Sequence, residues 1–165
     1  MIRVGIGYDT HRLAPGRPLV LGGVHIEHPR GLVGHSDADV VLHALTDAIL
    51  GAAGLGDIGD AFPDTDAANK DRDSADFLRA ALDRIRHAGW SVGNVDANVI
   101  AQEPKLGPLK ARMRERIAAL LEIDPAQVNV KAKTGEGIGS LGRAEGIACQ
   151  VVVLLSRAEA GGAGA

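Results

Sequence analysis

The 165-residue chain is long enough for one domain with its own core, and its 22 glycines indicate frequent tight turns. A formal charge of −3 and only one Tyr, one Trp and two Phe argue against nucleic-acid binding, which needs a basic surface or stacking aromatics. The single cysteine, Cys149, lies in an apolar run, so we expect a buried thiol, no internal disulfide and a cytoplasmic protein. The first residues lack the pattern of a secretory signal, and no apolar run reaches the ~20 residues of a membrane span.

The chain begins with an apolar segment that is followed by an aspartate and a histidine, two residue types that commonly bind metals. Ile2, Val4 and Ile6 predict a strand that leads into Asp9 and His11. Because side chains two apart in an extended chain point to the same side, this strand aims a carboxylate and an imidazole at one place. Residues 18–28 are predicted to form two short strand pieces joined at the glycines 22–23.

A strong helix is predicted to follow from residue 36. Ser36 is a natural N-cap, Asp37 and Asp39 would lie in the first turn, and the glycines from Gly51 onward would end the helix. A polar loop then leads to a second helix over 74–88. The remaining pattern is a strand at 94–102, a third helix beginning at Pro108, and strands at 128–134 and 146–155 joined by a glycine-rich loop.

Strands interleaved with three helices predict an α/β (α+β) fold in which helices cover one face of a sheet. We expect one domain over 1–156, since no repeat or linker divides the chain. The small, glycine-rich residues 157–165 are expected to form a disordered tail.

Asp9, His11 and His43 are candidate ligands of a zinc site. Two imidazoles and a carboxylate from two rigid elements would leave a fourth position free for water or a substrate oxygen. Asp39 or Asp47, four residues on either side of His43, could orient its ring. Spacing alone leaves a plainer alternative open, in which the helix residues form a solvated polar face and the aspartate caps a turn.

The segment GIGSLG at 137–142 matches the dinucleotide-binding motif G-x-G-x-x-G. That motif requires a helix after it and an acidic residue about 20 positions on, whereas here a strand pattern follows and the chain is nearly finished. We therefore expect a tight loop rather than a Rossmann site. Phosphate recognition is plausible beside this loop, where Lys133, Thr134, Glu136 and Arg143 gather.

Several stretches in order, GYDTHRL, HSDADVVLHALTDAILGAAGLGDIGDAFPDTD, NVDANVIAQEPKL and VNVKAKTGEGIGSLGRAEGIA, resemble the 2-C-methyl-D-erythritol 2,4-cyclodiphosphate synthase family over residues 1–156. The resemblance implies a homotrimer with active sites between subunits and a zinc ion in each, while composition and hydropathy had already argued against a nucleic-acid or membrane partner. It implies a substrate, 4-diphosphocytidyl-2-C-methyl-D-erythritol 2-phosphate, whose 2-phosphate attacks the β-phosphorus and expels CMP. The cyclic diphosphate that forms belongs to the non-mevalonate isoprenoid pathway.

The resemblance also implies roles for individual residues. It matches Asp9, His11 and His43 to the zinc ligands, and Glu136 to the carboxylate that holds magnesium or manganese on the diphosphate. His35 and Thr134 match positions that stabilise the transition state. Positions that match the family's binding sites are, for the methylerythritol phosphate, Ser36, Asp57, Ile58, Gly59, Phe62, Pro63, Asp64, Thr65 and Asp66, and, for the cytidine of a neighbouring subunit's substrate, Ala101, Gln102, Glu103, Pro104, Lys105, Leu106, Ala132, Lys133 and Thr134.

The chain departs from the family pattern near its glycine-rich loop. Lys133 and Gly135 interrupt a threonine run, and Ser140 stands where a phenylalanine is common. In the family that phenylalanine and the arginine matched by Arg143 line a cavity on the threefold axis that can hold isoprenoid diphosphates. Ser140 makes the cavity wider and more polar, which predicts weak binding of such lipids.

Two other classes of function remain as alternatives. A non-catalytic module could use the metal and the glycine-rich loop to sense a nucleotide or an isoprenoid phosphate. A structural or interaction protein would instead leave Asp9, His11 and His43 far apart in space. An open metal position favours the enzyme.

Overall fold

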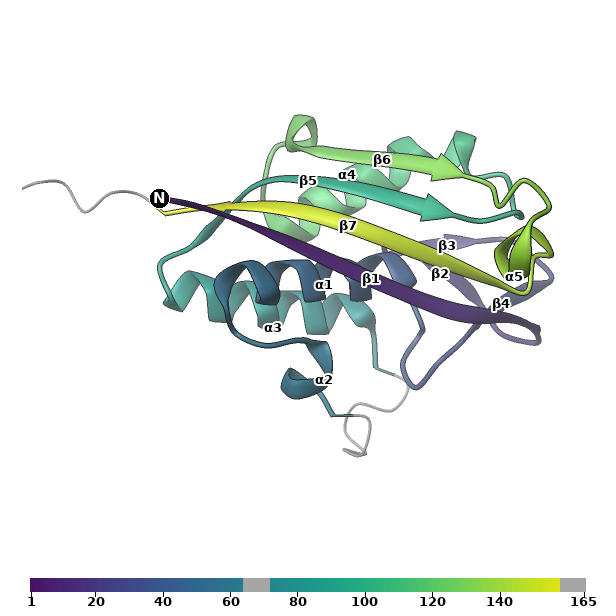
Figure 1. Cartoon of the computed structure of the whole chain (residues 1–165), viewed down its shortest axis with the longest axis horizontal. Helices are drawn as coiled ribbons and strands as arrows, with labels where there is room; N and C mark the ends of the chain where they lie inside the picture. The colour runs from purple at the N-terminus through teal and green to yellow at the C-terminus, as the bar shows by residue number, and fades with distance from the viewer. Residues whose placement is uncertain (64–71, 158–165) are drawn as a thin grey trace, which may run out of the picture.

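The computed structural model describes residues 1–63 and 72–157 and shows a mixed five-stranded sheet with helices packed on it (Figure 1). The strand order is β4-β1-β7-β5-β6, and all neighbours are antiparallel except β5 and β6. A separate hairpin pairs β2 with β3 across Gly22 and Gly23. The strands are β1 (Ile2–Pro15), β2 (Leu19–Leu21), β3 (Val24–Ile26), β4 (Arg30–Val33), β5 (Ser91–Ile100), β6 (Val128–Lys133) and β7 (Gly146–Ser156).

The three long helices, α1, α3 and α4, lie on one side of the sheet in two layers. α1 packs directly against β1 and β7, α4 packs against β6, and α3 packs on α1 (Figure 1). A continuous apolar core fills the space between them and extends from Leu13 to Leu155. Among the described residues, no helix has both the length and the apolar content to cross a membrane. The helices are α1 (Val40–Ala53), α2 (Ile58–Ala61), α3 (Ser74–His87), α4 (Lys110–Leu121) and α5 (Gly139–Gly142), with short 3₁₀ turns at Gly107–Leu109 and Pro125–Gln127.

The two faces of β1 are unlike each other. The face toward α1 carries Gly5 and Gly7, and a β carbon on either would overlap a backbone carbonyl oxygen of α1. The opposite face carries Ile2, Val4, Ile6 and Tyr8, each more than half exposed in the single chain. The apolar side of the strand therefore points away from the helices, and the helix approaches where side chains are missing.

Most of the predicted elements are present, with corrections at their ends. α1 begins at Val40, and its N-cap is Asp39 rather than Ser36, because the Asp39 side chain accepts the backbone N–H groups of Val41 and Leu42. α1 runs through Gly51 to Ala53, and its C-cap is Gly54, with a φ of 73°, one of the glycines that were predicted to end the helix. β1 does not stop at His11, since it pairs with β4 as far as Pro15.

Three short elements lie where the sequence predicted only loops: β4, α2 and α5. Four-residue segments give too little periodicity to be read from a pattern. In the predicted tail, Arg157 is held by a hydrogen bond from its backbone N–H to the carbonyl of Met1, whereas 158–165 lie outside the described residues. The prediction of one domain over 1–156 stays a prediction.

Candidate metal centre and active site

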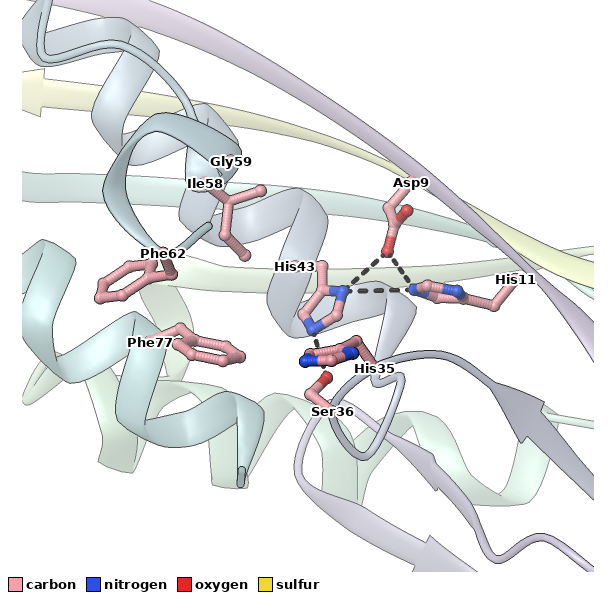
Figure 2. A pocket seen from close by; sticks show the side chains of 9 residues that line it. All are labelled: Asp9, His11, His35, Ser36, His43, Ile58, Gly59, Phe62 and Phe77. Carbon is pink, nitrogen blue, oxygen red and sulfur yellow. Dashed lines mark hydrogen bonds and ion pairs between the residues drawn. The ribbon is translucent and has the colours of Figure 1, made fainter. Parts of the chain in front are cut away.

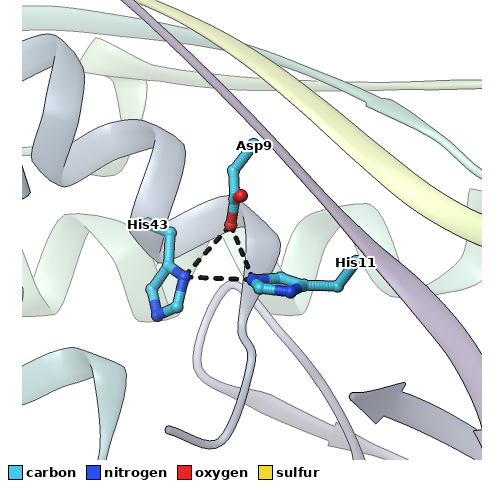
Figure 3. Close-up of side chains that lie close together, drawn as sticks. All are labelled: Asp9, His11 and His43. Atoms are coloured by element: carbon cyan, nitrogen blue, oxygen red, sulfur yellow. Dashed lines mark hydrogen bonds and ion pairs between the residues drawn. The ribbon is translucent and has the colours of Figure 1, made fainter. Parts of the chain in front are cut away.

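Asp9, His11 and His43 converge at the first turn of α1 (Figure 3). Asp9 Oδ2 lies 2.9 Å from His11 Nε2 and 3.0 Å from His43 Nδ1, and the two nitrogens lie 3.3 Å apart. Donor atoms around a tetrahedral metal with ~2.0–2.1 Å bonds are separated by roughly 3.3 Å. The spacing and the donor types therefore fit a divalent transition metal, and the prediction that these three side chains meet is confirmed.

The position of the three side chains follows from β1 and α1. Asp9 and His11 continue the glycine face of β1, two and four residues after Gly7. His43 precedes Ala44, whose carbonyl oxygen is the atom that a Gly7 side chain would strike. The close approach of helix and strand thus places the imidazole against the carboxylate.

The electrostatics of the trio keep Asp9 ionised. Burial by itself raises the pKa of Asp9, but hydrogen bonds and charge from His11 and His43 hold that pKa well below its usual range. Burial lowers the pKa of His11, and Asp9 together with the backbone carbonyl of Val33 outweighs this and raises it. Asp9 is thus an ionised ligand at neutral pH, with both imidazoles turned toward it.

A cavity of about 220 Å³ opens above the trio (Figure 2). It is smaller than the ~300–1,000 Å³ typical of a whole ligand, so within one chain it suits only part of a nucleotide-sized substrate. His35 and Ser36 contribute from the segment between β4 and α1, and Phe77 contributes from α3. The residues that line the cavity are Asp9, His11, His35, Ser36, His43, Ile58, Gly59, Phe62 and Phe77.

The segment that carries His35 and Ser36 is held by Arg17. The Arg17 guanidinium donates to the carbonyl oxygens of Leu32, Gly34 and Ser36 at 3.3, 3.4 and 3.2 Å. Arg17 was missed from the sequence, because nothing in its neighbourhood signals a contact with carbonyls up to 19 residues away. Phe77 was predicted only as a core residue, since its helical spacing matches the apolar stripe of α3.

Neither Asp39 nor Asp47 orients His43, so that expectation is wrong. Asp39 is fully buried and accepts the backbone N–H groups of Gly22 and Gly23 as well as those of its own helix. Asp47 accepts the N–H of Ile58 at 2.8 Å. The two carboxylates fasten the hairpin and α2 to α1, while His43 Nε2 meets the hydroxyl groups of Ser36 and Ser74.

A second cavity of about 480 Å³ lies at the ends of β5 and β6. It shares no lining residue with the first cavity. Glu103 lies outside its lining and forms an ion pair with Arg30. Of the positions predicted for cytidine, this cavity gathers Ala101, Gln102, Pro104, Lys105, Leu106, Ala132, Lys133 and Thr134.

The other predicted site residues lie outside both cavities. Glu136 is joined to the second cavity only through Thr134, which lines that cavity and whose hydroxyl donates to Glu136 at 3.1 Å. Asp57 caps α2 through the N–H of Asp60. Ser140 is exposed on α5, Arg143 pairs with Glu145, Pro63 is exposed, and Asp64, Thr65 and Asp66 lie outside the described residues.

A family model described as the YgbB family matches residues 2–156. The chain belongs to the YgbB family. Proteins named 2-C-methyl-D-erythritol 2,4-cyclodiphosphate synthase match it at 59% identity in Shouchella clausii (96% of this chain, 100% of the relative) and at 62% in Bordetella pertussis (94% and 96%). The resemblance found in the sequence is therefore confirmed, and these relatives bear the name of an enzyme.

Solved structures of similar proteins share the fold. The bifunctional IspDF of Campylobacter jejuni matches with a TM-score of 0.92 and 46% identity over 96% of this chain, which spans 43% of that longer protein. A 2C-methyl-D-erythritol-2,4-cyclodiphosphate synthase in a form bound to CDP matches with a TM-score of 0.87 and 38% identity, over 93% of this chain and 100% of that one. A cytidine nucleotide is thus a ligand of a protein with this fold.

Proposed function

We propose that the protein converts 4-diphosphocytidyl-2-C-methyl-D-erythritol 2-phosphate to 2-C-methyl-D-erythritol 2,4-cyclodiphosphate and releases CMP. The convergence of Asp9, His11 and His43 beneath an open cavity carries this proposal. Relatives at 59% and 62% identity bear the name of the enzyme that makes this product. The non-catalytic sensing module loses support, since it accounts for neither the relatives' names nor a metal centre open to a cavity.

In this reaction an oxygen of the 2-phosphate bonds to the β-phosphorus, and the bond from that phosphorus to the CMP oxygen breaks with its electrons leaving on CMP. Nucleophile and electrophile belong to one molecule, so the protein must fold the substrate and neutralise phosphate charge. A divalent ion held by Asp9, His11 and His43 supplies positive charge to phosphate oxygens. Zinc suits this nitrogen and oxygen donor set.

The remaining roles divide between the two cavities. His35 and Ser36 face the first cavity, where their side chains can donate hydrogen bonds to phosphate oxygens, and Ile58, Gly59 and Phe62 form the wall for the erythritol. The second cavity suits the cytidine, with Lys133 available to a phosphate. Glu136, beside Thr134, is the proposed ligand for magnesium or manganese on the diphosphate.

We also propose a homotrimer with active sites between subunits. Two observations support it. The exposed apolar side chains Ile2, Val4, Ile6 and Tyr8 form a sheet face that another copy of the chain can bury. His35 and Thr134, which would act on one substrate, line different cavities of a single chain.

The test is metal content and turnover of purified protein. We expect about one zinc per chain and release of CMP from the diphosphocytidyl substrate. Replacing His43 with Ala should remove both while the oligomer persists. If the His43→Ala variant released CMP at the wild-type rate, the proposed role of His43 as a metal ligand would be refuted.

A mixing experiment tests the shared active site. A His43→Ala chain lacks the metal centre, and a Thr134→Val chain lacks a hydroxyl of the other cavity. Neither homotrimer should turn over at the wild-type rate, but co-expressed chains should regain part of the activity, because some interfaces combine two intact halves. Mixed trimers no more active than their parents would place the whole site within one chain.

A further inference from the structure

His43 Nε2, the ring nitrogen that does not face Asp9, lies beside two buried serine hydroxyl groups. Nε2 points away from Asp9 and lies 2.9 Å from Ser74 Oγ and 3.0 Å from Ser36 Oγ. Figure 2 shows Nε2 directed at Ser36, on the side of the ring opposite Asp9. Ser74 is fully buried and Ser36 is 4% exposed.

One of these hydroxyl groups, that of Ser74, is hydrogen-bonded to the carboxylate of Asp37. Ser74 Oγ donates a short hydrogen bond to Asp37 Oδ1, and the Ser74 backbone N–H donates to Asp37 Oδ2 at 3.2 Å. The backbone N–H of Asp37 in turn donates to the carbonyl of Arg72 at 3.2 Å. These bonds fasten the beginning of α3 to the segment before α1.

The ionised state of Asp37 determines which atoms donate in the hydrogen bonds that link His43, Ser74 and Asp37. An ionised carboxylate can only accept, so the hydroxyl proton of Ser74 goes to Asp37. The Ser74 oxygen can then accept, and Nε2 of His43 at 2.9 Å is its nearer possible donor, while Ser36 Oγ lies 3.4 Å away. When a metal takes the lone pair of Nδ1, the atom that lies 3.0 Å from Asp9 Oδ2, a neutral imidazole carries its proton on Nε2.

We propose that Asp37 and Ser74 are positioning residues that fix the tautomer and the ring orientation of His43 for metal binding. The inference rests on the metal centre proposed above. Metal-bound histidines commonly donate their other N–H to a carboxylate or a carbonyl, and here a serine hydroxyl relays the carboxylate. His11 shows the simpler arrangement, since the backbone carbonyl of Val33 is hydrogen-bonded to it.

Ser36 is as close to Nε2 as Ser74 but is bonded differently. Its oxygen accepts the N–H of Ala38 at 3.1 Å, and within the described part of the chain no carboxylate is hydrogen-bonded to it. Its hydroxyl proton can turn toward the cavity that Ser36 lines or toward Ser74 Oγ, 3.4 Å away. Ser36 can act on a ligand, whereas Ser74 acts on His43.

The test is metal affinity, measured for zinc by competition with a chromogenic chelator and for cobalt by its visible absorption bands. We expect Ser74→Ala and Asp37→Ala each to weaken zinc binding about 10–100-fold and to shift the cobalt bands. Asp37→Asn keeps a side-chain oxygen that can accept from Ser74, so it should lose less. The Asp37→Ala/Ser74→Ala double variant should bind as Ser74→Ala does, because Asp37 acts through Ser74.

Asp73→Asn is the matched control. Asp73 is the N-cap of α3 and accepts the N–H of Ala75 at 2.8 Å, beside Ser74 in the chain. Asparagine caps a helix about as well as aspartate, so this variant should keep the melting temperature of the metal-free protein near that of wild type and leave zinc affinity within about twofold. Equal affinities and unchanged cobalt bands in the Asp37 and Ser74 variants would overturn the inference, as would fully additive losses. A wild-type protein that binds neither metal would instead refute the metal centre itself.

Discussion

Gly7 in β1 touches the backbone of α1 at Ala44, so closely that a β carbon on Gly7 would overlap the carbonyl oxygen of Ala44. The neighbour of Ala44 is His43, and two residues beyond Gly7 is Asp9. The separation between strand and helix at this contact therefore sets the separation between two of the proposed metal ligands. A missing side chain is what allows the centre to assemble.

Replacing Gly7 with Ala should damage both the fold and the metal centre. The added methyl must push α1 away from β1, at a cost of about 1–3 kcal/mol in the free energy of unfolding. Since His43 moves with α1, zinc affinity should fall as well. Chemical denaturation and zinc competition would measure the two effects.

Gly51→Ala provides the control for the Gly7 variant. Gly51 lies within α1, is exposed, and has open space around the position of a β carbon. This substitution should raise the free energy of unfolding by about 0.5–1 kcal/mol, because alanine favours helix over glycine. Normal zinc binding by Gly7→Ala would show that the close contact does not position His43.

Ile6→Asp should separate the proposed oligomer. Ile6 is 62% exposed in the single chain, in the middle of the apolar face of β1, and a charge buried there between subunits would have no partner. We expect monomers by light scattering, about one zinc per chain, and little CMP release. Leu55→Asp, an exposed apolar residue after α1, should leave the oligomer intact, and an intact Ile6→Asp trimer would place the interface elsewhere.

Asp39 should make the stability of the metal-free protein depend on pH. Burial raises the pKa of Asp39 to about 6, although the N–H groups of Gly23 and Gly22 act to lower it. A folded-state pKa above the unfolded one means that the folded chain binds the extra proton between about pH 4 and 6. The stability that this carboxyl contributes is thus greatest below about pH 4 and falls as the pH rises through that window.

Asp39→Asn cannot titrate, so it isolates this effect. The difference in free energy of unfolding, Asp39→Asn minus wild type, should increase by about 1–3 kcal/mol as the pH rises from 4 to 7. Urea titrations at equal protein concentration, with a chelator present, measure the difference. The opposite trend would show that the four backbone N–H groups outweigh burial and stabilise the carboxylate.

Cys149 should be unreactive in the folded protein. The thiol is fully buried on β7, and burial raises its pKa far above neutrality, so the reactive thiolate is scarce. A thiol reagent at pH 8 should label less than a tenth of the native chains within an hour and one thiol per chain in denaturant. Rapid labelling of native protein would mean that β7 opens readily.

The sequence predicted much of the architecture because its signals are local. The apolar stripe of the helix over 74–88 and the glycine turn at 22–23 depend on neighbours a few residues away, and both are confirmed. Asp9 and His11 were predicted to share a side from strand periodicity alone. Ser36 shows the limit of such local reasoning, since several polar residues before α1 could serve as its N-cap, and the backbone geometry selected Asp39.

The residue types that could bind a metal were therefore fixed by the sequence, as were the elements that carry them. Their meeting was decided by tertiary structure, because the distance from His43 to Asp9 depends on how closely α1 approaches the glycine face of β1. The bonds from Ser74 to Asp37 and from Arg17 to three carbonyls likewise join residues 15 to 37 positions apart. Such contacts leave no periodic trace in a sequence, since they arise only when separately folded elements pack together.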